Sequence, residues 1–110
     1  MTRRDKAMQH WDSATEDRYE AVHAVLRHNG FILVSSAGSH RIYRHPDLTE
    51  AYKNSKDTDP LLRESFGPDG QLTIPVKNGQ TVKGRYLRNI LLALDVIKGK
   101  SSSQGGVVDG

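Results

Sequence analysis

Two strand-forming runs separated by a short turn lie in the middle of the sequence, and they constrain the fold more than any other feature. Residues 31–34 are apolar and rich in strand formers, whereas residues 35–38 are all small. Residues 39–45 then alternate in character, as successive residues of a half-buried strand do. The sequence therefore predicts a β-hairpin over residues 31–45.

Side chains along a strand point alternately to the two faces of a sheet, so the second run divides into two sets. One face carries His40, Ile42 and Arg44, and the other carries Arg41, Tyr43 and His45. One of these faces must meet the helices that flank the hairpin.

An amphipathic helix is predicted before the hairpin. Ser13 and Glu16 have the spacing of a capping box, in which each side chain bonds the backbone amide of the other, so the helix is expected to start at Ser13. Apolar residues recur at helical spacing across residues 19–26. Asn29 and Gly30 then supply a stop signal, because glycine readily adopts the left-handed conformation that ends many helices.

The hairpin is followed by a segment, residues 46–71, that proline, glycine and aspartate interrupt repeatedly. It is predicted to be a loop-like insertion in which a short helix over residues 60–66 is possible, with a proline at its first position. A third strand is predicted over residues 72–76, and Asn78 and Gly79 form a turn that closes it.

A last amphipathic helix is expected to start near Thr81 or Lys83, because apolar residues recur at helical spacing over residues 87–94. Lys83 and Arg85 would then lie in its first turn. Positive charge there opposes the helix dipole, so these side chains either serve an anion or are solvated surface charges.

The predicted order of elements is helix, strand, strand, strand, helix. Two helices on one face of a three-stranded antiparallel sheet form a small α+β domain with the α-β-β-β-α architecture of double-stranded-RNA-binding domains (dsRBD). The expected organisation is an N-terminal tail over residues 1–12, one domain over residues 13–97 with the insertion at about 46–71, and a flexible, Gly/Ser-rich tail over residues 98–110.

Composition limits the classes of function. The 110 residues include 16 Lys and Arg against 13 Asp and Glu, for a formal charge of +3, which favours a polyanionic partner. There is no cysteine, so disulfides, thiolate zinc sites and a cysteine nucleophile are excluded. No apolar run approaches the ~20 residues that span a bilayer, and no signal peptide is recognisable, so a cytoplasmic location without membrane association is expected.

Three stretches of the sequence resemble the HicA-type toxins, which are the mRNA interferases of bacterial toxin–antitoxin pairs. They read LRHNGFILVSSAGSHRIYRHP, LTIPV and VKGRYLRNILLALDV, and together they cover about residues 19–46 and 72–96. The Gly38-Ser39-His40 triplet that opens the second strand is the most specific part of the resemblance.

The resemblance implies a dsRBD-like fold and a ribonuclease that cleaves mRNA without a metal or other cofactor. It also implies neutralisation by a HicB-like antitoxin, and it carries the family's catalytic histidine over to His40. Three departures are visible. Lys77 stands where many members have a histidine, the segment between Gly84 and Leu87 has one residue more than expected, and the insertion at 46–71 is longer than the usual connection.

The chemistry of metal-free RNA cleavage agrees with this assignment. A general base must take the proton of a 2′-hydroxyl as it attacks the adjacent phosphate, and histidine titrates near neutrality. Cationic side chains and backbone amides stabilise the negative charge that develops on the phosphorus centre. The residues expected to bind RNA are Gly38, Ser39, Arg41, Arg44, Lys77, Lys83 and Arg85.

Two alternatives stay open at this point. The same fold can serve as a non-catalytic RNA-binding module, and Lys77 in place of a histidine favours that alternative. The surface can instead serve mainly a protein partner, with the insertion or the edge strand that contains Pro75 as the contact.

The other conspicuous residues have structural interpretations. His45 precedes a proline on the face opposite His40 and is expected to be structural or at the surface, while His23 and His28 are not in register for one metal ion. Trp11 is expected to fix the N-terminal segment to the domain. Tyr43 either packs in the core or stacks on a nucleobase.

Overall fold

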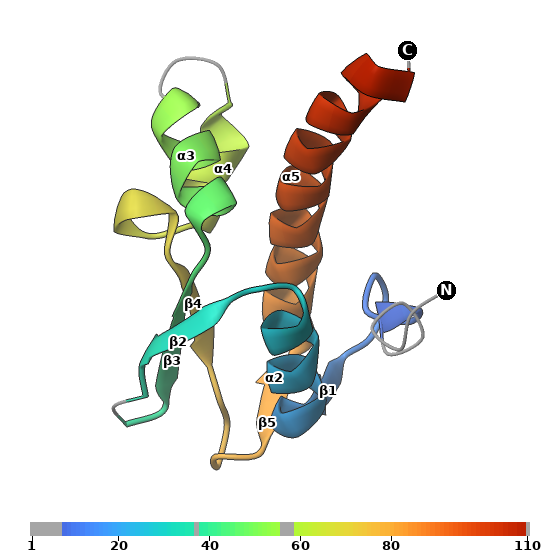
Figure 1. Cartoon of the computed structure of the whole chain (residues 1–110). Coiled ribbons are helices and arrows are strands. Elements are labelled where there is room, and N and C mark those ends of the chain that lie inside the picture. The colour runs from blue at the N-terminus through green and yellow to red at the C-terminus, as the bar shows by residue number, and fades with distance from the viewer. Residues whose placement is uncertain (1–7, 37, 56–58, 110) are drawn as a thin grey trace.

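The computed structural model describes residues 8–36, 38–55 and 59–109, with side chains as far as residue 98. The described strands form two sheets, and the first and last strands of the chain pair with each other (Figure 1). The elements are β1 (Glu16–Arg18), α2 (Tyr19–His28), β2 (Ile32–Ser35), β3 (His40–Arg44), α3 (Pro46–Asn54), α4 (Pro60–Ser65), the 3-10 helix η1 (Pro68–Gly70), β4 (Leu72–Pro75), β5 (Thr81–Lys83) and α5 (Gly84–Asp109).

The main sheet is antiparallel, with the strand order β2-β3-β4. Ile32 pairs with Arg44 across the predicted hairpin, and His40 pairs with Pro75 of β4. Helices α2 and α5 lie on one side of this sheet (Figure 1). The predicted α+β class, with a three-stranded antiparallel sheet covered by helices, is thus confirmed, and the arrangement is consistent with a dsRBD-like fold.

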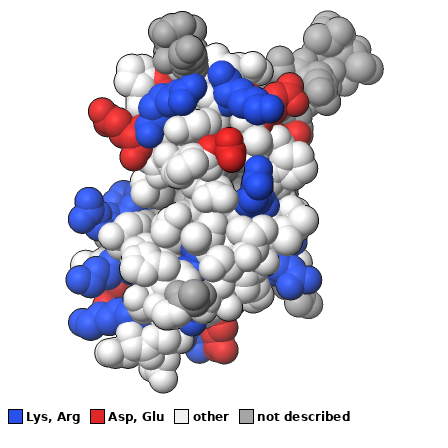
Figure 2. All heavy atoms as spheres, turned by 90° about the vertical axis from the view of Figure 1, so that its left-hand side faces the viewer, with Lys and Arg blue, Asp and Glu red and all other residues white. Residues whose placement is uncertain are grey.

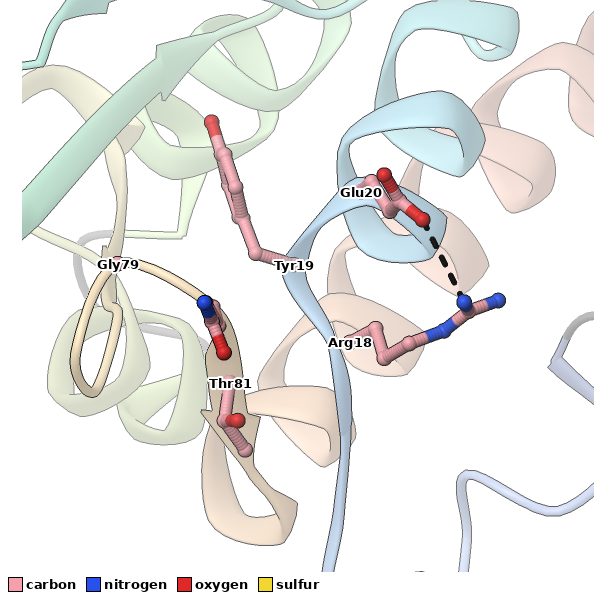
Figure 3. Close-up of a pocket in the computed structure, with 6 residues that line it drawn as sticks. Arg18, Tyr19, Glu20, Gly79 and Thr81 are labelled. Atoms are coloured by element: carbon pink, nitrogen blue, oxygen red, sulfur yellow. Dashed lines mark ion pairs between the residues drawn. The ribbon is translucent and has the colours of Figure 1, made fainter.

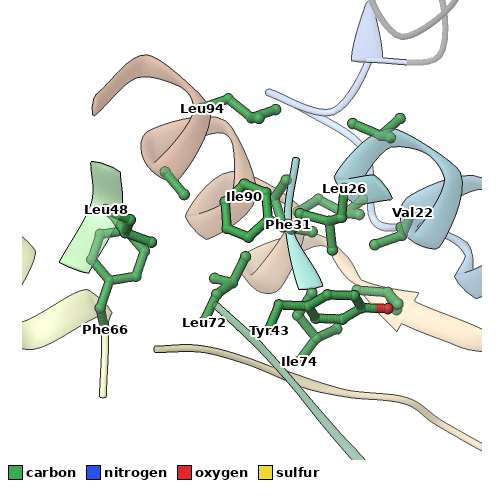
Figure 4. Packing of buried hydrophobic residues seen from close by; sticks show 14 of the residues in the cluster. Val22, Leu26, Phe31, Tyr43, Leu48, Phe66, Leu72, Ile74, Ile90 and Leu94 are labelled. Atoms are coloured by element: carbon green, nitrogen blue, oxygen red, sulfur yellow. The ribbon is translucent and has the colours of Figure 1, made fainter. Parts of the chain in front are cut away.

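The hydrophobic core lies between the sheet and the two helices. Tyr43, Leu72 and Ile74 point from the strands toward Leu26 of α2 and Ile90 of α5, and all five side chains are buried (Figure 4). The face of β3 that carries Tyr43 therefore meets the helices, which confirms that this tyrosine packs in the core.

The prediction of a helix start at Ser13 is wrong. Glu16 lies in β1, where it pairs with Lys83 of β5, and helix α2 begins only at Tyr19 without a side-chain cap. The Ser13 amide, which a capping box would bond to the Glu16 side chain, donates instead to the His10 carbonyl at 3.2 Å. Long-range pairing has overridden the local signal.

Trp11 attaches the N-terminal segment to strand β1, as expected. Its ring is fully buried, and its indole nitrogen donates to a carboxylate oxygen of Asp17 at 2.7 Å. The segment around Trp11 thus contributes to the core, although the sequence analysis assigned residues 1–12 to a tail.

The last helix also starts later than expected. Residues Thr81 and Lys83 are the ends of strand β5, which pairs with β1 in a second, two-stranded sheet that the sequence analysis missed. Asn78 and Gly79 form the predicted turn, with φ angles of 53° and 70°, and Gly84 opens α5. Lys83 is consequently a strand residue and not part of the first helical turn.

The segment over residues 46–71 contains more regular structure than a loop. Helix α3 starts at Pro46, with His45 as its N-cap, because Nδ1 of His45 accepts from the amide of Asp47 at 3.1 Å. Leu48 anchors this helix in the core. Helix α4 matches the predicted short helix to within one residue.

Helix α5 continues in its backbone to Asp109, so the tail expected from residue 98 is helical here. The mobility expected for that tail stays a prediction. Within the described part of the chain, none of the helices combines the length and the apolar composition that crossing a bilayer requires.

We predict that Gly84→Ala destabilises the protein by about 2 kcal/mol, the typical scale of overpacking. A Cβ at this position would collide with the Ala14 carbonyl oxygen and press on the Arg88 guanidinium. Urea unfolding measures the effect. Gly67→Ala is the matched control, because a Cβ there meets only ordinary contacts at 3.7 Å and beyond, and equal stability of the two variants would contradict the prediction.

Candidate functional site

His40 is the first residue of β3, at the mouth of the hairpin, and its side chain is exposed. The turn before it is tied to the neighbouring strand, because the Val76 amide donates to the Ser39 carbonyl at 2.7 Å. His40 itself pairs with Pro75. The imidazole is thus held on a fixed backbone position while remaining accessible to a ligand.

The turn before His40 is open to solvent at Gly38. Its φ angle is +60°, a conformation that other residues adopt rarely, and a Cβ built on it would meet nothing within 4 Å. Gly38 and Ser39 are both exposed. A phosphate group can therefore approach the backbone of the turn closely. The hairpin end of the molecule shows basic side chains on both flanks of a largely uncharged band (Figure 2).

Arg44 lies on the same face of β3 as His40, on the side of the sheet away from the helices. They are four positions apart in the sequence, which corresponds to about 13 Å along an antiparallel strand. Lys77 is exposed and follows directly after Val76, the residue bonded to the turn. We call the side of the sheet away from α2 and α5 the open face. Arg44 and Lys77 lie at opposite ends of it.

Lys83 and Arg85 lie elsewhere. Lys83 is on β5 opposite Glu16, in the two-stranded sheet, and Arg85 is in the first turn of α5 with its guanidinium 5.6 Å from the Tyr86 ring. Both are exposed. The structure thus brings Gly38, Ser39 and His40 together with the end of β4, but it places these two cations in another part of the surface.

Arg41 contacts the turn before His40. Its Nη1 donates to the Gly38 carbonyl at 2.8 Å, and its guanidinium carbon lies 5.3 Å from the centre of the Tyr19 ring. The side chain is half-buried on the face opposite His40. Arg41 therefore links the turn that carries the candidate catalytic residue to helix α2.

A polar cluster that the sequence analysis missed lies behind Arg41. The hydroxyls of Tyr19 and Tyr43 are 2.6 Å apart, and Nδ1 of His23 is 2.7 Å from the Tyr43 hydroxyl. Burial, together with the hydrogen bond to Tyr19, raises the pKa of Tyr43, whereas burial and the charge of Arg27 lower the pKa of His23. Both shifts favour the uncharged forms of Tyr43 and His23, which suits their position against the core.

One sequence signal pointed to this cluster. Tyr19 and His23 are four residues apart on α2, so they share a face of the helix, and Tyr43 is on the helix-facing side of β3.

Tyr19 also lines a hollow of about 420 Å³ between the start of α2 and the turn at Gly79. An exposed ion pair of Arg18 and Glu20 borders it, and no residue of the predicted site does (Figure 3).

His45 has a structural role. His45 caps α3, and its ring centre lies 5.1 Å from that of Phe31, which confirms the structural interpretation. Among the described residues, no group of three or more histidine and carboxylate side chains is placed to hold a metal ion.

Comparison with known proteins agrees with this geometry. Residues 19–96 match the family described as the HicA toxin of bacterial toxin–antitoxin systems, a span that includes the hairpin, the turn before His40 and most of the core. No curated protein and no solved structure matches the chain. Because the match covers well over half of the sequence, the chain belongs to the HicA family of toxins of bacterial toxin–antitoxin systems.

Proposed function

We propose that this toxin is a metal-independent endoribonuclease in which His40 acts as the general base. The observation that carries the proposal is an exposed histidine on an anchored strand, behind a glycine turn that a phosphate can approach. In the reaction, a neutral imidazole takes the proton of a 2′-hydroxyl, whose oxygen attacks the adjacent phosphorus. The P–O5′ bond breaks, the leaving 5′-oxygen takes a proton from solvent water, and the RNA keeps a 2′,3′-cyclic phosphate.

The surrounding groups divide the remaining tasks. The amides and the hydroxyl of Gly38 and Ser39 can donate to phosphate oxygens, while Arg44 and Lys77 attract the strand on either side. Lys83 and Arg85 lie farther away and contribute to general attraction of RNA. We propose that Arg41 mainly holds the turn, since its guanidinium already bonds Gly38 and stacks on Tyr19.

The proposed substrate is mRNA, and the proposed inhibitor is a HicB-like antitoxin. The formal charge of +3 favours both, because an acidic antitoxin surface can compete with RNA for the same cations. We place both events in the cytoplasm.

A non-catalytic RNA-binding module is the second candidate function. Lys77 favours it, because this exposed cation stands beside the turn at a position where many family members carry a second histidine. A lysine there binds phosphate well but transfers protons poorly at neutral pH.

We predict that His40→Ala reduces RNA cleavage in EDTA by about 10²- to 10⁴-fold, the usual contribution of general acid–base catalysis, while RNA binding persists. The assay follows a defined single-stranded RNA and measures binding by fluorescence anisotropy. His28→Ala is the control, since it removes another exposed histidine from α2. Cleavage by His40→Ala at the parent rate would rule out the assigned role, and binding without cleavage by the parent would favour the second candidate.

We predict that Arg41→Ala lowers kcat by about tenfold while leaving KM for RNA, and the salt dependence of binding, nearly unchanged. Removal of a side chain that contacts phosphate would instead reduce the slope of log K for RNA binding against log[salt], the salt slope, by about one unit. Arg63→Ala serves as the control, because Arg63 stacks on Tyr52 at 4.4 Å in another part of the chain. A reduced salt slope with unchanged kcat would show that Arg41 binds RNA directly and does not position the turn.

A further inference from the structure

A groove of about 510 Å³ lies between the open face of the hairpin and helix α3. Ile32 and Val34 of β2 contribute apolar surface, Arg44 lines it from β3, and Thr49 and Lys53 line it from α3. The volume is within the range of small-molecule sites, about 300–1,000 Å³. Helix α3 follows β3 directly, so the two walls meet at the end of that strand (Figure 1).

The groove is continuous with the face that presents His40. Arg44 lines the groove and shares that face, about 13 Å along the strand from His40. Stacked nucleotides are spaced by about 3.4 Å, and extended ones by more, so this distance corresponds to at most about four nucleotides. An RNA strand that runs along β3 from His40 therefore reaches the groove within a few nucleotides of the cleaved bond.

The groove offers the mixture of groups that a nucleotide requires. Ile32 and Val34 are 63% and 48% exposed, although both are large aliphatic residues. An unstacked base can cover such a surface, while Arg44 and Lys53 provide positive charge for the phosphates. Glu50 adds one carboxylate to the lining, so cations still outnumber anions there.

The wall formed by α3 is firmly attached to the domain. Its first turn is capped by His45 and starts with a proline, and Leu48 on the same helix is fully buried. The groove thus has a defined shape before any ligand arrives, which reduces the entropy that binding costs. Without α3 the apolar residues of β2 would lie on an open surface.

We propose that this groove is a subsite for a nucleotide flanking the cleaved bond, and that α3 thereby contributes to substrate selection. The inference rests on the proposed ribonuclease function. A partner protein that adds a strand to the edge of β2 is the less favoured occupant. That strand has only four residues, and a bulge between Leu33 and Ser35 interrupts its pairing, so it is a poor template for strand addition.

The test compares long and short RNAs that share one cleavage site. In one series the nucleotides 5′ of the site are trimmed, and in the other those 3′ of it. For the parent protein we expect kcat/KM to be about tenfold higher with the long RNA in one of the series, equivalent to about 1.4 kcal/mol. Ile32→Asp and Lys53→Ala are each expected to bring that ratio close to one.

Two features keep the test specific. Leu61→Asp is the matched control, because Leu61 is 54% exposed on α4 and does not line the groove, so its ratio should equal that of the parent. The same RNAs are also titrated against His40→Ala protein, whose binding does not depend on cleavage. A length effect on binding there would support the subsite even if the parent proved not to cut RNA.

A ratio that both groove variants leave at the parent value would overturn the proposal. So would a parent ratio near one in both series. If, instead, Ile32→Asp and Lys53→Ala abolish binding of a purified HicB-like antitoxin without changing the ratio, the groove belongs to the protein partner and the RNA subsite is wrong. Thermal unfolding of each variant shows whether the fold is retained, and Lys53→Ala, on an exposed helical position, tests the proposal if Ile32→Asp unfolds.

Discussion

The alternation of side chains along β3 is the constraint on which the rest of the structure depends. Tyr43 is fully buried, and its hydroxyl lies within 2.7 Å of partners on α2. A slip of one residue in the pairing of β3 would send Tyr43 to solvent and bring His40 into the core. The buried tyrosine therefore determines that His40 and Arg44 lie on the open face. A buried hydroxyl with satisfied hydrogen bonds makes the alternative register costly.

Much of the main sheet was predictable because its signals are local. The hairpin, the third strand, the apolar faces of the two long helices and the short helix at Pro60 each follow from a few neighbouring residues. The two-stranded sheet of β1 and β5 was not predictable, because each strand has three residues and their pairing joins positions 16–18 to positions 81–83. Helix α3 was also missed, since histidine is an unusual N-cap and the segment is rich in residues typical of turns.

In the candidate site, too, the features with a local sequence signal were predictable and those that depend on long-range packing were not. Strand alternation alone placed His40 and Arg44 on one face, and the structure agrees. The separation of Lys83 and Arg85 from that face depends on how two sheets are arranged in space, which no local pattern specifies. The role of Arg41 was hidden for a related reason, since its contacts with Gly38 and with Tyr19 become visible only after α2 has packed against the hairpin.

Together these features describe a small scaffold in which the core positions a polar site at its edge. Tyr19, His23 and Tyr43 form a part-buried cluster, Arg41 stacks on Tyr19, and Arg41 in turn bonds the turn before His40. Helix α3 adds a wall beside the far end of the same strand. The proposed chemistry requires little movement of these parts, because the turn is already bonded to β4.

In the proposed reaction, the nucleophile is a 2′-hydroxyl of the RNA itself. The most direct measurement places a single 2′-deoxynucleotide on the 5′ side of the scissile phosphate and analyses the products of a reaction in EDTA by mass spectrometry. We expect the unmodified RNA to yield a 2′,3′-cyclic phosphate end and the substituted RNA to stay intact at that position. Cleavage of the substituted RNA, or 3′-hydroxyl ends from the unmodified one, would contradict it.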